Sequence, residues 1–527
     1  MSAIRSQRLA GIALRPHLEA ILAILAAILL LAAAVVVGRT SAIGLIVIGV
    51  GLAVLVAAAS LRWPRTVIVL VVLTPIFDRY FIADWLPANV AQLAHFLSEG
   101  VLLTVGTALG FQAWRRGRLV PAIRHPVTIA FGAFLAVTLI SALVNAVPPQ
   151  VALVGVGFTL DAAACFYLPR LVGFSVRQSL IAVGVILALV MVSAIGGLIQ
   201  WTLNPNFLGL VVWQGWFGEV YRLASIFSDP NTFGALLIGA IPFAAFGITS
   251  LHRPGHRLAA LIAAILLFMP LYLSFSRGAW GGLVVGGGIA LAFMSWRTLA
   301  ITVGIGIISL MMAVTVPRMV LYDAPPPPPL PEVEATPEPP RQPSLIESTI
   351  GRIAEIWAGR DLRTLFIVNG VPIVLDHPLV GVGPGRYGGA AADVFGSPVY
   401  AEYGTDKLFL DPNQRTVDNF WLHTLVETGI LGLAAFVAAG LAALVPLIRA
   451  ARRLRGWNRF LVGGIAGGTA AMAANAVTTM LLEANSVAFV VWFLLGLGSL
   501  ALGALGMSRD PAAPAVATAD AAESPPS

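Results

Sequence analysis

The sequence carries Asp376-His377-Pro378-Leu379-Val380-Gly381-Val382-Gly383-Pro384-Gly385 inside its only long polar interval, from about Pro317 to Gly429. That interval opens with a proline run at residues 325–329, after Ala324, and closes on Val417-Asp418-Asn419-Phe420-Trp421-Leu422-His423, where an apolar segment begins. The chain on either side consists mainly of apolar runs of about twenty residues, the length that spans a bilayer as a helix. We therefore predict membrane-embedded helices that hold this interval on one side of a membrane.

The composition supports the same prediction. The chain is 58% hydrophobic and 11% charged, and its mean hydropathy is +0.89, whereas a soluble protein has about a quarter charged residues. Unpaired backbone groups are too costly in lipid, so spanning segments are helices or a closed barrel. Runs of about twenty residues favour helices over short alternating strands. The predicted fold class is an all-α polytopic integral membrane protein.

The net charge of +7 and the pI of about 10.0 would suggest nucleic acid in a soluble protein. Here we attribute the arginines to topology signals in cytoplasmic loops and expect no nucleic-acid partner. The single cysteine, Cys165, lies inside an apolar run, so it forms no intrachain disulfide and says nothing about compartment. The first apolar run is too long for a signal peptide and is predicted to be a retained span.

We predict about 12–14 transmembrane helices, within a few residues at each boundary. The candidates are 17–38, 41–61, 65–82, 91–113, 126–146, 151–172, 180–202, 231–250, 256–275, 278–295, 298–316, 419–447, 460–482 and 486–506. The predicted organisation is a bundle over 1–316, an extracytoplasmic loop over 317–417, further spans over 418–506 and a disordered cytoplasmic tail over 507–527.

The arginines predict the orientation. Starting from a cytoplasmic N-terminus, alternate loops are basic throughout the chain, as the positive-inside rule requires. Both termini are then cytoplasmic and the 317–417 loop is extracytoplasmic. Its proline run predicts an extended arm. After it, Ser344-x-x-Glu347 resembles a capping box and opens an expected amphipathic helix over 345–358.

Three polar clusters precede or open predicted spans. They are Tyr221-Arg222-Leu223 with Phe227-Ser228-Asp229-Pro230-Asn231, then Ser274-Phe275-Ser276-Arg277-Gly278-Ala279-Trp280, then Asp418-Asn419 through His423 with Glu427-Thr428-Gly429. The predicted topology puts all three at outward helix N-termini, where free N–H groups and the positive end of the helix dipole gather. Because an N-terminus plus an arginine binds anions, we predict a pocket for a phosphorylated ligand.

Each of these residues also has a structural interpretation. Either arginine can simply extend to the headgroups, and Asp229 can be an N-cap with Pro230 in the first helical position. Asp418 can likewise be a cap, and His423 a packed, hydrogen-bonded core residue. His377 can serve only to shape a turn. The glycines of 381–385 resemble a phosphate loop, but no strand precedes them, so the dinucleotide interpretation fails.

The ionisable residues show no metal-ligand spacing and no nucleophile–base pair, and we expect neither a metal nor a cofactor. A metal-independent glycosyl transfer fits this inventory. An activated sugar diphosphate supplies the leaving group, arginines neutralise the charge that develops on it, and a carboxylate or imidazole takes the proton of the acceptor hydroxyl.

With these motifs in this order, the sequence resembles the O-antigen ligase and polymerase superfamily. The matching stretches lie between about Tyr221 and Leu433. They are Arg222 with Ser228-Asp229-Pro230-Asn231, then Ser276-Arg277-Gly278, then His377 to Gly385, then Asp418-Asn419 with Glu427-Thr428-Gly429-Ile430-Leu431-Gly432. The resemblance implies a GT-C-type glycosyltransferase in the cell (inner) membrane.

It also implies a glycan on undecaprenyl diphosphate as donor, a glycan or lipid as acceptor, and a chain-length regulator or other polysaccharide-assembly proteins as partners. The family's two functional arginines correspond to Arg222 and Arg277. Ligases of the family carry a histidine where this sequence has Asp418, which favours the polymerase-like members. Asp418 is the first candidate for the base and His423 the second. Expected substrate-binding residues are Asn231, Ser276, His377, Arg386 and Asn419.

The leading hypothesis is a polysaccharide polymerase that joins lipid-linked units. The first alternative is a ligase that moves finished glycan to a lipid or protein. A transporter of anionic or lipid-linked solutes is the rival from another class, although internal repeats are not evident and the polar clusters lie at span ends rather than at mid-membrane. Solute uptake that follows expression without a change in glycan length would favour the transporter.

Overall fold

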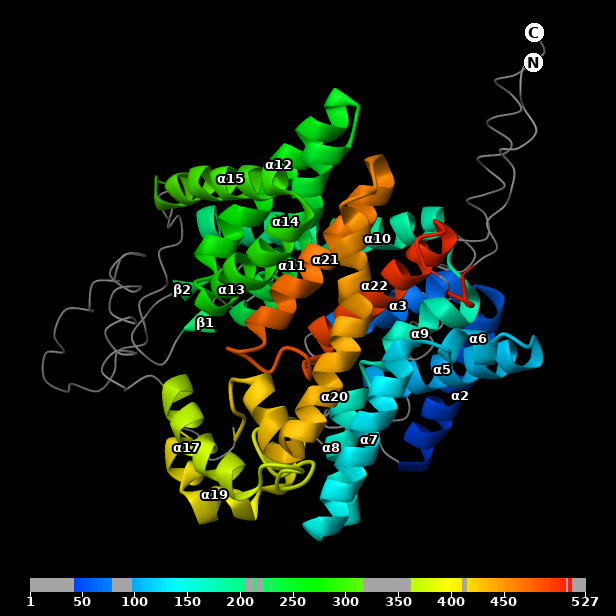
Figure 1. Cartoon of the computed structure of the whole chain (residues 1–527), viewed down its shortest axis with the longest axis vertical. Coiled ribbons are helices and arrows are strands. Elements are labelled where there is room, and N and C mark those ends of the chain that lie inside the picture. The colour runs from blue at the N-terminus through cyan, green and yellow to red at the C-terminus, as the bar shows by residue number, and fades with distance from the viewer. Residues whose placement is uncertain are drawn as a thin grey trace, which may run out of the picture. The chain divides into compact units, whose positions relative to one another are not determined.

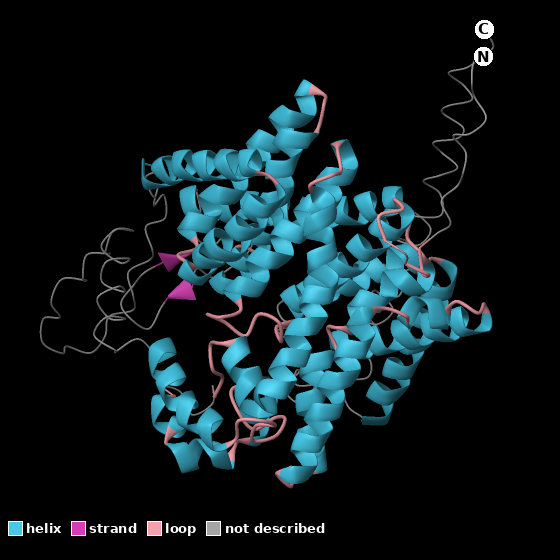
Figure 2. Ribbon diagram, viewed as in Figure 1, coloured by secondary structure: helices cyan, strands magenta, loops and turns pink. Residues whose placement is uncertain are grey.

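The structure is a computed structural model that describes residues 42–77, 97–203, 213–214, 221–227, 229–315, 362–409, 415–508 and 510–513. The regular secondary structure of the described part is helical except for β1 (Trp213–Gln214) and β2 (Tyr221–Arg222), which form a two-stranded antiparallel ladder (Figure 2). Eight helices in these residues are long and apolar enough to cross a membrane, and a broken pair makes nine if it counts as one span. The prediction of an all-α polytopic membrane protein is therefore confirmed.

Thirteen of the fourteen candidate spans fall on helices of the structure (Figure 1). The first candidate, the proline arm and the expected helix over 345–358 lie outside the described residues. The candidate over 151–172 is two helices, α8 (Pro149–Leu160) and α9 (Ala164–Val172), rather than one continuous span. The helix breaks at Asp161, whose carboxylate accepts the N–H of the next residue and competes with the helical hydrogen-bond pattern.

The chain divides into two compact units. The first unit contains residues 1–125, 160–182 and 488–527. Its helices are α2 (Ala42–Arg62), α3 (Pro64–Phe77), α5 (Leu97–Arg115), α6 (Leu119–Ile123) and α9, with most of α22 (Asn485–Ala504).

A buried ion pair fixes the segment around Asp510 within the first unit. Arg170 of α9 donates to Asp510 at 2.5 Å, and both side chains are almost fully buried. Ser499 also donates to Asp510 at 2.8 Å, and Arg170 donates to the carbonyl of Ala122 at 2.7 Å. The expectation of a disordered tail from residue 507 is thus wrong for Asp510–Ala513, because a charge pair between distant parts of the sequence anchors them.

The second unit contains residues 126–159 and 183–487. At its centre α11 (Pro230–Ser250) packs against α12 (Pro254–Leu273) and α21 (Gly456–Asn475). Small residues of α21 permit the close approach, since a Cβ on Gly464 would lie 2.1 Å from the Phe243 ring. The other helices of the unit are α7 (Pro126–Val144), α8, most of α10 (Val176–Thr202), α15 (Trp296–Thr315) and α20 (Phe420–Ala451).

One span of this unit begins at Arg277 and combines α13 (Arg277–Gly282), a π-helical turn η4 (Leu283–Gly287) and α14 (Gly288–Met294). Gly278, Gly282 and Gly286 recur at every fourth position and face α21, where a Cβ would lie within 2.9 Å of α21 atoms. This stripe brings the two helices into near backbone contact. The start of α13 is thereby fixed beside the end of α21.

The predicted 317–417 loop contains a folded core of its own. It holds α17 (Leu362–Asp376), α18 (Ala390–Phe395), α19 (Pro398–Tyr403) and the 3-10 turn η5 (Thr405–Leu408). Phe366, Ile373, Tyr387 and Tyr400 pack with Leu422 and Val426 of α20 in one hydrophobic cluster. Figure 1 shows α17 and α19 together near the beginning of α20. The segment that contains α17, α18 and α19 therefore packs against the first turns of α20.

Candidate active site

Arg222 brings the first two polar clusters together. Its Nε donates to the carbonyl of Ser274 at 3.0 Å, and its Nη2 donates to the side-chain oxygen of Asn231 at 2.9 Å. Ser276, which is 1% exposed, donates to the same Asn231 oxygen at 3.1 Å. The carboxamide of Asn231 thus orients one arginine of the first cluster and one hydroxyl of the second.

Asp229 holds Asn231 in position. Its carboxylate accepts the backbone N–H groups of Asn231 at 3.1 Å and Thr232 at 2.9 Å, and Pro230 occupies the first turn of α11. The predicted N-cap is confirmed. Capping is compatible with a site, because the cap fixes the residue that contacts Arg222.

The turn before α13 has an unusual backbone. Phe275 has φ +50°, a left-handed conformation that a bulky residue rarely adopts. The N–H of Ser276 donates to the Ser274 hydroxyl at 3.2 Å, and the N–H of Arg277 donates to the Phe275 carbonyl at 3.0 Å. This turn buries Ser276 against Asn231 and leaves Arg277 exposed at the first position of a span. Such local strain concentrates at functional sites.

The charges around Arg222 form one electrostatic cluster. The pKa of Arg222 is lowered to about 10, chiefly by burial and also by repulsion from Arg363 and Arg277, while Asp229 and Asp418 oppose the shift. Arg222 stays protonated at neutral pH. We call Arg222, Arg277, Arg363, Asp229 and Asp418 the charge cluster. It contains more positive than negative groups and gathers the starts of α11, α13 and α20, so it suits an anion.

Asp418 faces Arg363 of α17 within this cluster. The two side chains form an ion pair with Nη2–Oδ2 at 3.2 Å, and half of the Asp418 side chain (49%) remains exposed. Desolvation by the surrounding protein raises the pKa of Asp418, as does Asp229, while Arg363 and Arg222 act against the shift. A carboxylate with a raised pKa is a stronger base that still reaches solvent.

Asp418 is not the cap of α20, so that alternative is wrong. The cap is Asn419, whose side-chain oxygen accepts the N–H of Leu422 at 3.0 Å. Because Asn419 satisfies the helix start, the neighbouring carboxylate is available to Arg363. Sequence reasoning missed Arg363, because it belongs to no motif and meets Asp418 only through the packing of α17 on α20.

The third and fourth motifs of the resemblance interlock around Glu427. Its carboxylate accepts the N–H groups of Gly385 at 2.9 Å and Tyr387 at 2.8 Å, and its own carbonyl accepts the N–H of Gly383 at 3.0 Å. A protein carboxylate therefore occupies the amides that a phosphate loop would offer to a ligand. The glycine stretch is a structural element of this protein, consistent with the failure of the dinucleotide interpretation.

A kink at Gly429 completes this arrangement. Gly429 has φ +64° inside α20, and a Cβ there would lie 2.3 Å from the backbone of Leu379. The N–H groups of Ile430 and Leu431 donate to the carbonyls of Pro378 and Leu379. The chain around Pro378 thus enters the kink and caps the second half of α20.

His423 lies inside the protein rather than in the charge cluster. It is 2% exposed. Its Nδ1 hydrogen-bonds the Tyr387 carbonyl, and its Nε2 lies 3.6 Å from Glu483 Oε2. Glu483 in turn accepts the N–H of Ala390 at 3.0 Å. The alternative of a packed, hydrogen-bonded core histidine is confirmed, and the contacts link His423 to the residues that follow the glycine stretch of 381–385.

The remaining predicted residues lie outside the contacts of the charge cluster in the described part of the chain. The His377 carbonyl accepts the N–H of Gly381 at 3.1 Å, which is the turn role predicted as its alternative. Arg386 donates to the carbonyl of Ala146 at 3.4 Å, after α7. Among the described residues, no group of three His, Cys, Asp or Glu could hold a metal.

Taken together, the fold and these contacts define a multi-pass helical membrane protein with a cationic cluster at the starts of three spans. Residues 262–437 match the family model of O-antigen ligase, and no curated protein matches the chain. The match covers about a third of the chain and supports the resemblance to the O-antigen ligase and polymerase superfamily that the motifs indicated. The matched region includes Ser276, Arg277 and the motifs from His377 to Gly432; Arg222 and Asn231 precede it.

Proposed function

We propose that this protein is a polysaccharide polymerase that transfers a glycan from undecaprenyl diphosphate to a hydroxyl of another lipid-linked unit. The observation that carries the proposal is the charge cluster, in which Arg222 interacts electrostatically with Arg277 and with Asp418 at the starts of three spans. Arginines at helix N-termini suit a diphosphate, and a carboxylate beside them suits the acceptor. The segment that carries α17 then faces the outside of the cell (inner) membrane, with both termini in the cytoplasm.

In the proposed reaction the acceptor oxygen attacks the anomeric carbon of the donor glycan. The bond from that carbon to the diphosphate oxygen breaks, and the polyprenyl diphosphate leaves with its electron pair. Arg222 and Arg277 stabilise the charge that develops on the leaving group. The proton of the acceptor hydroxyl passes to Asp418, which Arg363 orients.

Asn231 and Ser276 support the donor site rather than the base. The Asn231 oxygen accepts hydrogen bonds from both Arg222 and Ser276, so it fixes the direction of the Arg222 guanidinium. An arginine held in this way loses less freedom when an anion binds. Asn419 and His423 act through α20 and the glycine stretch, and so position Asp418.

The second candidate is a ligase, favoured by the description of the family that matches. The chemistry is the same with a lipid or protein acceptor. The aspartate at position 418 supports the polymerase, because family ligases resemble one another in having histidine there.

The test is the size distribution of carrier-linked glycans in a deletion strain. Single repeat units on the carrier indicate a polymerase, and long carrier-linked chains indicate a ligase. An unchanged profile together with solute uptake would support the transporter instead.

Complementation then tests the site. Arg277→Ala is expected to restore no polymer although the protein accumulates in the membrane at the wild-type level. Arg297→Ala, at an exposed arginine that begins α15 outside the charge cluster, is the matched control and is expected to restore it. Full-length polymer from Arg277→Ala would refute the assignment.

A further inference from the structure

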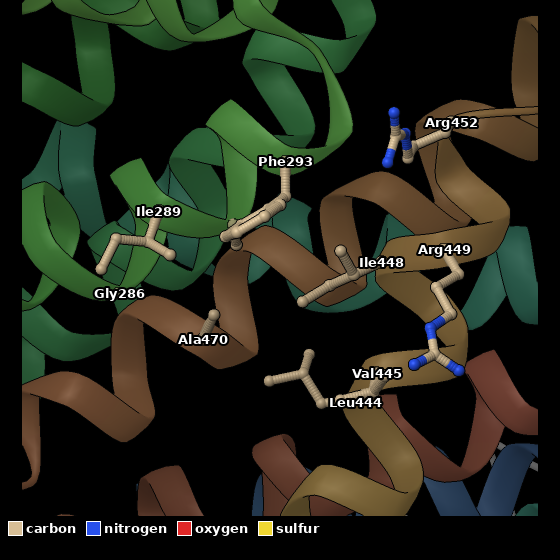
Figure 3. Close-up of a pocket in the computed structure, with 10 residues that line it drawn as sticks. Gly286, Ile289, Phe293, Leu444, Val445, Ile448, Arg449, Arg452 and Ala470 are labelled. Carbon is tan, nitrogen blue, oxygen red and sulfur yellow. The ribbon is translucent and has the colours of Figure 1, made fainter.

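A groove lies in the second unit between α14, α20 and α21. Its cavity of about 470 Å³ is lined by Gly286, Ile289, Ala290, Phe293, Leu444, Val445, Ile448, Arg449, Arg452 and Ala470. Figure 3 shows Ile289 and Phe293 of α14 on one side and Leu444 and Ile448 of α20 on the other, with Ala470 of α21 between them. Apart from the two arginines, every lining residue is apolar.

The apolar walls are open to the surroundings. Phe293 is 63% exposed and Ile289 is 56% exposed. Both belong to a segment long and apolar enough to cross a membrane, as does the part of α20 that they face. Hydrocarbon is the medium that contacts such side chains, so an acyl chain suits the groove.

Two arginines close one end of the groove. Arg449 lies in the last turn of α20 and Arg452, three positions on, is the C-cap residue with helical φ and ψ, so their side chains leave the same face of the helix. Both are exposed, and within the described residues neither side chain takes part in an ion pair or hydrogen bond. Two adjacent cations beside an apolar channel match the chemistry of an anionic phospholipid.

The groove is remote from the charge cluster. Only Asn419 separates Asp418 from the start of α20 at Phe420, and the helical rise to Leu444 is about 36 Å along an axis that bends at Gly429. The hydrocarbon core of a bilayer is about 30 Å thick. The two sets of arginines therefore serve opposite ends of α20, and a donor diphosphate held by Arg222 does not reach Arg449.

We propose that this groove binds one anionic phospholipid of the bilayer. An acyl chain lies along Ile289, Phe293 and Ile448, and the phosphate sits between Arg449 and Arg452. The proposal does not depend on the glycosyltransferase assignment, since the groove and the charge cluster share no residue.

The test is native mass spectrometry of the purified full-length protein titrated with phosphatidylglycerol or with phosphatidylcholine of the same acyl chains. The double variant Arg449→Gln/Arg452→Gln is expected to weaken phosphatidylglycerol binding by at least about tenfold, at roughly fivefold for each arginine near a headgroup. Phosphatidylcholine binding is expected to change little. Ile289→Trp, at an exposed position, is expected to reduce the binding of both lipids by filling the groove.

The matched control is Arg453→Gln/Arg455→Gln, which removes the same charge from exposed neighbours that do not line the groove. It is expected to retain phosphatidylglycerol. Equal loss in both double variants would overturn the proposal in favour of diffuse surface attraction. A wild-type protein without preference for phosphatidylglycerol, or one that retains a polyprenyl phosphate there instead, would overturn it as well. Melting temperatures equal to wild type establish that each variant is folded.

Discussion

Arg363 Nη2 lies 3.2 Å from Asp418 Oδ2, although 55 positions separate the two residues in the sequence. Arg363 belongs to the first turn of α17, and Asp418 directly precedes Asn419, the cap of α20. The pair therefore joins the folded segment before α20 to the start of a span. It also connects the proposed base, Asp418, to Arg222. Asp229 and Arg363 influence the pKa values of both groups.

The pair predicts a shift in the pH dependence of activity. Arg363 acts to lower the pKa of Asp418, which burial has raised, so Arg363→Gln raises that pKa further. A base works only when deprotonated, and the acidic limb of the rate profile should therefore move to higher pH. The measurement is the pH profile of glycan transfer by purified protein.

Two further variants serve as controls for this prediction. Arg363→Lys, which keeps the positive charge, should restore most of the original profile. Lys407→Gln removes an exposed cation from the same segment and should leave the profile in place. An acidic limb that is the same in Arg363→Gln and wild type would argue against Asp418 as the base.

The hydrogen bonds of Asn231 predict that substitutions at this position can weaken donor binding without lowering the stability of the protein. Asn231→Ala removes an acceptor shared by Arg222 and Ser276, and such a loss costs about 1–3 kcal/mol. We expect roughly tenfold to hundredfold weaker binding of a polyprenyl diphosphate analogue. Asn231→Asp keeps the acceptor but adds a negative charge, so it should retain the wild-type melting temperature and still bind the analogue weakly. Calorimetric titration distinguishes these outcomes, and unchanged affinity in both variants would exclude Arg222 as a donor ligand.

The kink in α20 predicts a contrast between two glycines of one helix. Gly429→Ala forces a side chain into the left-handed region and against Leu379, which should destabilise the protein by more than about 3 kcal/mol. Gly440→Ala meets open space and should be neutral or slightly stabilising. Melting temperatures in detergent measure both. Equal effects would show that the Pro378–Leu379 connection does not depend on this kink.

The buried pair of the first unit predicts that a few residues near the C-terminus contribute to stability. Breaking a buried ion pair from one side costs about 3–5 kcal/mol, so Asp510→Asn should lower the melting temperature markedly. Truncation after Met507 should do the same, whereas truncation after Ala513 keeps Asp510 and should have little effect. Equal melting temperatures for the two truncated proteins would show that Asp510 does not stabilise the protein.

The same pair has a defined pH window. Burial alone would raise the pKa of Asp510, but the hydrogen bonds and charge of Arg170 outweigh burial and lower it. A lowered folded-state pKa means that the stabilisation is present above about pH 4, the usual range of an aspartate, and is lost as the pH falls through the folded value. Asp510→Asn should therefore flatten the acid side of the stability curve.

The spans and the caps could be predicted because their causes are local. An apolar run of about twenty residues leaves a membrane segment little alternative to a helix. Asp229 caps α11 because Pro230 and two free N–H groups follow it directly. The order of the motifs likewise marked Arg222 and Arg277 without knowledge of their neighbours.

Other features depended on groups that only folding brings together. Two contacts decide that Asp418 is an ion-pair partner rather than a cap. Asn419 caps α20 in its place, and the packing of α17 brings Arg363 beside it. The role of Glu427 depended on Gly385 and Tyr387 presenting their N–H groups to it. Hydropathy carries no information about such contacts.

The sequence by itself determined a multi-pass helical protein with arginine-bearing clusters at span starts, since hydrophobic length and helix capping act over a few neighbouring residues. Only the tertiary structure decided that His423 is enclosed by Tyr387 and Glu483, that Asp418 pairs with Arg363, and that Asp510 anchors to Arg170. These charges pair over long sequence separations, and their partners are chosen by how the helices pack.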